Sequence, residues 1–145
     1  MTMRRPRQHL LGNSVSFLVG TRHLSSSDYH HSREILIHRV ACAIELSLKT
    51  FLQWRGRSDD RCRLEIRHDL TKALKAAAGL GFRPSHPDLP WLAAVLSPYY
   101  CHQRIGELAA NVPALPSLQT AIHATEGLLS DIRASTRTRR SSSRP

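Results

Sequence analysis

Apolar residues recur every three or four positions along most of the chain, a period typical of amphipathic helices and not of strands. The longest such stretch follows residues 25–28 (SSSD), which favour a helix start, and ends at Gly56. No segment alternates between apolar and polar residues for long enough to indicate a strand. The apolar stripe of this long predicted helix is made by Ile37, Val40, Ala41, Ile44, Leu48, Phe51 and Leu52.

Two further helices are predicted by the residues that favour helix starts and ends. After a polar segment at residues 56–63, which we predict to be a loop, Asp69 is placed to cap a helix that ends at the glycines of residues 79–81. Asp88 then precedes a segment with Pro90 in its first turn, which predicts another helix. Pro98 is expected to end or kink that helix.

The last predicted helix is capped by Ser117 and runs to about Ala134. Together with a weaker helical segment, these elements predict an all-α protein, a bundle of four to five helices over residues 12–134. Residues 1–11 are expected to be a frayed basic end. Residues 135–145, rich in Arg and Ser, are expected to be a disordered tail.

The charge and the cysteines narrow the class of protein. The net charge of +10 is concentrated at the two ends, which would attract nucleic acid or another polyanion without specificity. The three cysteines are widely spaced, so no zinc or disulfide pattern is present, and no metal or other cofactor is predicted. No apolar run approaches the roughly 18 residues that cross a membrane, and we expect a cytoplasmic protein.

One pair of segments carries a resemblance to a known family. The sequence AIELSLKTFLQWRGR, a loop, and then RHDLTKALKAAAGLG resembles the HEPN family of small helical domains. The matching pattern is A-x-E-x-x-L-K on one helix and H-D-L at the start of the next. The residues that carry it are Ala43, Glu45, Leu48, Lys49, His68, Asp69 and Leu70.

The resemblance implies a helical bundle of HEPN type that forms homodimers. It further implies that the protein acts together with a partner protein of the nucleotidyltransferase type, in an RNA-related, stress or toxin–antitoxin setting. Some members of the family are non-catalytic modules, and others are metal-independent endoribonucleases. The catalytic members use an Arg and a His separated by four to six residues, in which the His exchanges a proton and the Arg stabilises phosphate charge.

Four pairs in this chain fit that spacing, and two of them are kept as alternative candidates. They are Arg33 with His38, inside the long predicted helix, and Arg63 with His68, across a loop and a helix start. The spacing alone is weak support, because a chain with so many Arg and His residues contains about three such pairs by chance.

A structural role for His68 is the other interpretation. If the two helices pack as they do in the HEPN family, His68 would hydrogen-bond Glu45, because a buried carboxylate needs a partner. Three functions therefore stay open. The first is a non-catalytic HEPN-like module, and the second is an endoribonuclease that uses one of the Arg–His pairs. The third is a general nucleic-acid binder that relies on the basic ends.

Overall fold

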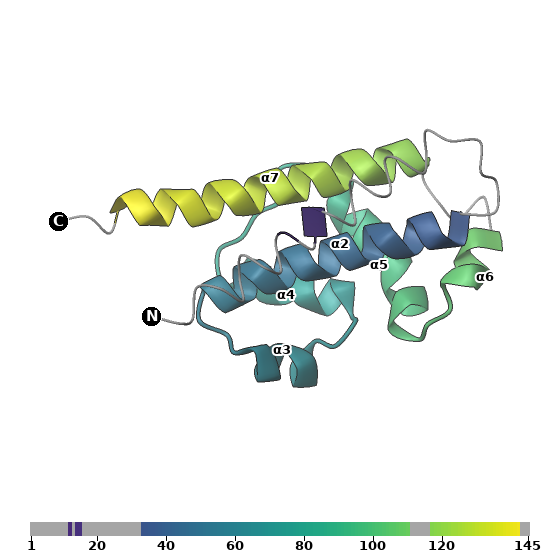
Figure 1. The fold of residues 1–145 in the computed structure, drawn as a ribbon, viewed down its shortest axis with the longest axis horizontal. Coiled ribbons are helices and arrows are strands. Elements are labelled where there is room, and N and C mark those ends of the chain that lie inside the picture. Colours follow the sequence, from purple (N-terminus) through teal and green to yellow (C-terminus); the bar gives the residue numbers. More distant parts are fainter. Residues whose placement is uncertain (1–11, 13, 16–32, 111–116, 143–145) are drawn as a thin grey trace.

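The computed structural model describes residues 12, 14–15, 33–110 and 117–142, and for 138–142 the backbone alone. This part of the chain is all-α and contains no strand, which confirms the predicted fold class (Figure 1). No described helix is both long and apolar enough to cross a membrane. The helices are α2 (Arg33–Trp54), α3 (Asp59–Glu65), α4 (Leu70–Gly79), α5 (Leu89–Cys101), α6 (Ile105–Ala110) and α7 (Leu118–Ser142).

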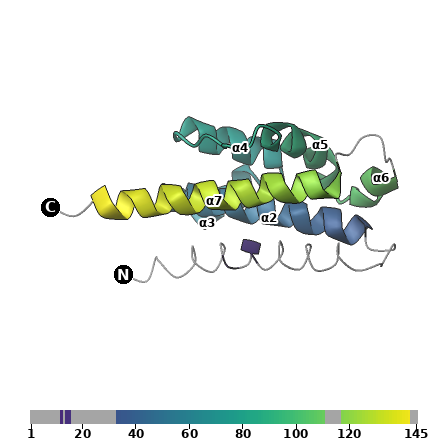
Figure 2. The same ribbon diagram turned by 90° about the horizontal axis from the view of Figure 1, so that it is seen from above.

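Helix α2 is the centre of the bundle and packs against each of the other described helices. Helix α7 lies along it, and α4 and α5 pack against each other on another side of α2 (Figures 1 and 2). The apolar stripe predicted for residues 37–52 faces inward, with Ile44, Leu48 and Leu52 fully buried. Packing of this stripe is the main source of stability for the bundle.

Several predicted helix starts and ends are confirmed. The Asp69 side chain accepts a hydrogen bond from the Lys72 backbone N–H at 3.0 Å, and Ser117 caps α7 through Thr120 N at 3.1 Å. Gly81, with a φ of +96°, follows the end of α4. Asp88 occupies the N-cap position of α5, but its side chain makes no capping hydrogen bond.

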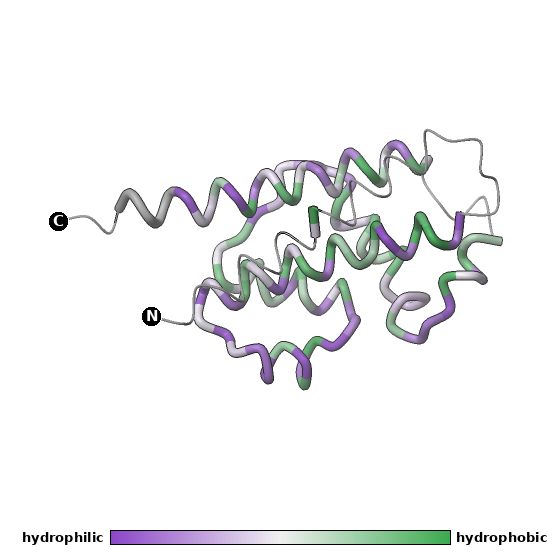
Figure 3. The backbone as a smooth tube through the Cα atoms, in the orientation of Figure 1, coloured by the Kyte–Doolittle hydropathy of each residue, from purple (hydrophilic) through white to green (hydrophobic). Residues whose placement is uncertain are grey.

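One prediction about an element boundary is wrong, and one of the two outcomes expected at Pro98 does not occur. Residues 56–63 are not all loop, because Ser58 caps the short helix α3 through Arg61 N. This segment is mostly hydrophilic and buries only Cys62 within its helix, so its apolar pattern gives no sign of a helix (Figure 3). Pro98 does not end α5, which continues to Cys101. Proline removes one backbone hydrogen bond there, and the burial of Tyr100 in the core outweighs that loss.

The last helix also extends further than expected. It runs to Ser142, past Ile132, the last buried residue among those whose side chains the structure describes, and its C-terminal part projects beyond the other helices (Figures 1 and 2). No Gly or Pro occurs between residues 128 and 144, so no residue that terminates helices interrupts it. The predictions for residues 1–11 and for the helix start at residues 25–28 lie outside the described part of the chain.

Candidate functional site

Glu45 is a carboxylate buried in the middle of α2, and three side chains surround it. Its Oε1 lies 2.5 Å from His68 Nδ1 and 3.5 Å from Lys49 Nζ. Its Oε2 accepts a hydrogen bond from the Tyr100 hydroxyl at 3.2 Å. The predicted contact between Glu45 and His68 is therefore present, and it joins α2 to the segment that precedes α4. These partners compensate the carboxylate for the hydration that it loses on burial.

His68 is positioned by the turn between α3 and α4. Arg67 adopts a left-handed backbone conformation, with a φ of +53°, and Asp69 begins the next helix as its N-cap. Asp69 also accepts a hydrogen bond from Ser97 Oγ at 2.8 Å, which connects the turn to α5. Partial burial opposes ionisation of Asp69, but the hydrogen bonds from Lys72 N and Ser97 prevail and lower the pKa of its carboxyl.

A chain of polar contacts continues from Glu45 to His38. Cys42 Sγ lies 3.4 Å from the Tyr100 hydroxyl and 3.5 Å from His38 Nδ1. Because the phenol donates to Glu45, the thiol can donate to the phenol oxygen, and the sulfur can then accept from His38. Burial raises the pKa of Tyr100, and the charge of Glu45 raises it further; burial likewise raises the pKa of the Cys42 thiol. Both groups are therefore neutral hydrogen-bonding links at physiological pH.

The two histidines at the ends of this chain face the same pocket, which has a volume of about 480 Å³. Both imidazole rings make edge contacts with the Tyr100 ring, with centroid distances of 5.6 Å for His38 and 5.4 Å for His68. The pocket lies where α2, α5 and α6 meet the turn before α4. Its lining is formed by Glu34, Ile35, His38, His68, Tyr100, Gln103 and Ile105.

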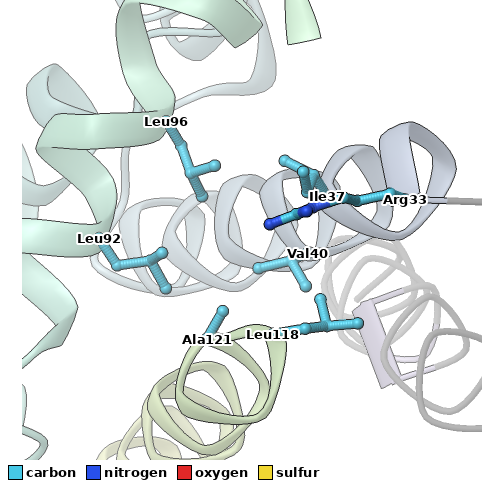
Figure 4. A pocket seen from close by; sticks show the side chains of 7 residues that line it. All are labelled: Arg33, Ile37, Val40, Leu92, Leu96, Leu118 and Ala121. Atoms are coloured by element: carbon cyan, nitrogen blue, oxygen red, sulfur yellow. The ribbon is translucent and has the colours of Figure 1, made fainter. Parts of the chain in front are cut away.

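Neither candidate arginine lines this pocket. Arg33 lies instead beside Ile37 at a separate apolar pocket of about 30 Å³ between α2, α5 and α7 (Figure 4). Arg63 is exposed and pairs with acidic residues of its own helix, at 2.9 Å from Asp60 and 3.6 Å from Asp59. Within one chain, the structure thus brings the two predicted histidines together and leaves both predicted arginines elsewhere.

Sequence reasoning missed Tyr100 and Gln103, which complete the site. Tyr100 is separated from Glu45 by 55 positions, so no local pattern connects them. A weaker signal was available for Cys42, because its spacings to His38 and Glu45 place all three on one face of a helix. Within the described residues, no group of three or more His, Cys, Asp or Glu side chains is arranged to hold a metal ion.

Comparison with known proteins assigns no chemistry to this site. No protein-family model matches the sequence, and neither a curated protein nor a solved structure is significantly similar to the chain.

Proposed function

We propose that this protein is a HEPN-like helical module that is not catalytic by itself. In this proposal it acts as a homodimer with a protein partner, of the nucleotidyltransferase type, in an RNA-related, stress or toxin–antitoxin setting.

The observation that supports the proposal is that the residues of the family-like pattern form one structural unit. Ala43, Leu48 and Leu70 are fully buried in the core. Glu45 contacts Lys49 and His68, and Asp69 caps the helix that follows. The Glu45–His68 contact joins α2 to the segment before α4, and the other residues of the pattern pack in the core, pair with Glu45 or cap α4.

Within a single chain, the positions of the arginines favour a non-catalytic role. An Arg that stabilises phosphate charge must lie close to the His that moves the proton. Arg33 lines a different pocket from His38, and the Arg63 guanidinium pairs with Asp60.

The test is induced expression of the full chain in a bacterial host, with growth and total RNA integrity as readouts. We expect normal growth and intact RNA for the wild type, and the same for the matched variants His38→Ala and His68→Ala. Sedimentation analysis of the purified protein should give twice the mass of one chain. A monomer at micromolar concentration would contradict the proposed mode of action.

A second candidate function, metal-independent RNA cleavage, is favoured by one observation. His38 and His68 face one pocket, and two imidazoles can serve as the acid and the base of a proton-transfer reaction. In the same experiment, growth arrest with RNA degradation that one His→Ala substitution abolishes in a folded protein would establish this candidate instead.

A further inference from the structure

The C-terminal part of α7 extends past the core that the rest of this helix helps to form. The helix continues over residues 133–142, which follow Ile132, the last residue that the described side chains show as buried. At about 1.5 Å per residue this segment is about 15 Å long, and it projects beyond the other described helices in both views (Figures 1 and 2). We call residues 133–142 the C-terminal arm.

The C-terminal arm carries a high density of positive charge. Arginine occupies positions 133, 137, 139 and 140, and no acidic residue follows Asp131 in the sequence. The side chains of Arg133 and Arg137 are exposed and have no carboxylate partner within the described part of the chain. By contrast, Arg63 and Arg104 each lie 2.9 Å from a carboxylate of their own segment.

The composition of the arm does not favour a helix by itself. Ser and Thr are weak helix formers, and Arg133 and Arg137 repel each other because they are one turn apart. The favourable position of cations at a helix C-terminus offsets only part of this repulsion. Anions bound along the arm would remove the repulsion and give the arginines the partners that the chain does not provide.

The hydroxyl groups of the arm are already used within the helix. Ser135 Oγ donates to the Asp131 carbonyl oxygen at 2.9 Å, and Thr136 Oγ1 donates to the Arg133 carbonyl oxygen at 3.0 Å. The arginines are therefore the groups through which the arm can contact a partner.

The shape of the arm favours duplex DNA among the polyanions. An α-helix with its side chains is about 10–12 Å across, and the major groove of B-form DNA is about 12 Å wide. The major groove of duplex RNA is too deep and narrow for side chains to read. Positions 133, 137 and 140 share one face of the helix and position 139 lies on another, so the arm offers positive charge to the phosphates on both sides of a groove.

We propose that the C-terminal arm binds in the major groove of duplex DNA and that its arginines contact the backbone phosphates. Because the arm projects beyond the other helices, the bundle stays outside the groove. A disordered basic tail would attract any polyanion, whereas a helix of fixed direction can enter a groove of matching width. The inference goes beyond the proposed function and does not depend on it, since neither the Glu45–His68 contact nor the pocket beside it takes part.

The experiment is fluorescence anisotropy of a labelled DNA duplex of about 20 base pairs, titrated with the full chain over a series of salt concentrations. The double variant Arg133→Gln/Arg137→Gln should bind at least tenfold more weakly at low salt. The slope of log affinity against log salt should fall by about two, because two phosphate contacts are lost. The matched control is Lys72→Gln/Lys75→Gln, which removes the same charge from exposed positions of α4 and should change the affinity less than threefold.

Thr136→Pro separates the helical arm from a flexible basic tail of the same charge. Proline at this position breaks the helix, and the bundle should stay folded because the substitution lies beyond Ile132. The affinity for duplex DNA should fall at least fivefold although no charge is removed. The control at the same site is Thr136→Ala, which keeps the helix and should keep the affinity.

Four results would overturn the proposal. The first is the absence of binding between folded wild-type protein and duplex DNA at micromolar concentrations and low salt. The second is an equal loss of affinity in the arginine and lysine double variants, which would indicate attraction by net charge alone. The third is unchanged affinity in Thr136→Pro, which would assign binding to a flexible tail. The fourth is equal or tighter binding of a duplex RNA of the same sequence, which would exclude groove binding of the proposed kind.

Discussion

A carboxylate inside an apolar helix face needs several partners, and Glu45 shows how this chain supplies them. His68 and Lys49 bring positive or potentially positive groups to Oε1, and the Tyr100 hydroxyl donates to Oε2. Each partner lies on a different turn or helix. The contacts that offset the free-energy cost of burying this carboxylate therefore also connect those parts of the fold.

Asp69 gives a prediction for the dependence of stability on pH. Because folding lowers the pKa of its carboxyl, Asp69 stabilises the folded state above its ordinary value of 3.8. This contribution is lost as the pH falls through the folded-state pKa. Asp69→Asn, which keeps a capping oxygen, should reduce the free energy of unfolding at pH 7 by no more than about 1 kcal/mol.

The measurement for Asp69 is urea unfolding of the wild type and Asp69→Asn at several pH values. The difference between the two proteins should shrink as the pH falls below 3.8 and vanish at strongly acid pH. A stability difference that grows toward acid pH would show that the predicted pH dependence of the Asp69 contribution has the wrong sign.

At the scale of the elements, two glycines near the end of α4 allow a matched comparison. A Cβ at Gly79 or at Gly81 would meet no atom within 4 Å, so neither substitution causes a clash. They differ in the backbone, because only Gly81 has a positive φ, at +96°.

The two substitutions should therefore have opposite effects. Gly79→Ala should stabilise the protein by about 0.5–1 kcal/mol through helix propensity. Gly81→Ala should destabilise it by about 1–2 kcal/mol, since alanine is strained in the left-handed region. Thermal unfolding of both variants checks this, and equal shifts of Tm in the same direction would contradict the role given to the backbone of Gly81.

The boundaries of the elements were predictable where a local interaction fixes them. Asp69 and Ser117 bond to backbone N–H groups three residues later, a range that a sequence pattern covers. Helix α3 was not predictable in this way, because it buries Cys62 alone and is otherwise polar. The continuation of α5 through Pro98 depends on packing between helices, which outweighs the local preference of proline.

At the scale of the whole molecule, contacts far apart in the sequence were only partly predictable. The contact between Glu45 and His68 followed from the need of a buried carboxylate for a partner and from the resemblance of the two segments to one family. Tyr100 could not be assigned to Glu45, because only the packing of α5 on α2 brings them together. The same holds for Ser85, whose hydroxyl donates to Asp131 Oδ1 at 2.9 Å and connects the segment before α5 to α7.

Glu45 and His68 form a structural connection between α2 and the segment that opens α4. A double-mutant cycle with Glu45→Gln, His68→Gln and the double variant tests it most directly, with the free energy of unfolding in urea as the readout. The side chain of His68 is 52% exposed whereas that of Glu45 is 9% exposed, so solvent weakens the pair without removing it. We predict a coupling energy of about 1–2 kcal/mol for this pair, and the control cycle between Glu45 and Lys49 measures an ion pair of 3.5 Å that lies within α2 and connects no second element. A coupling energy near zero, with all three variants as stable as the wild type, would contradict the claim.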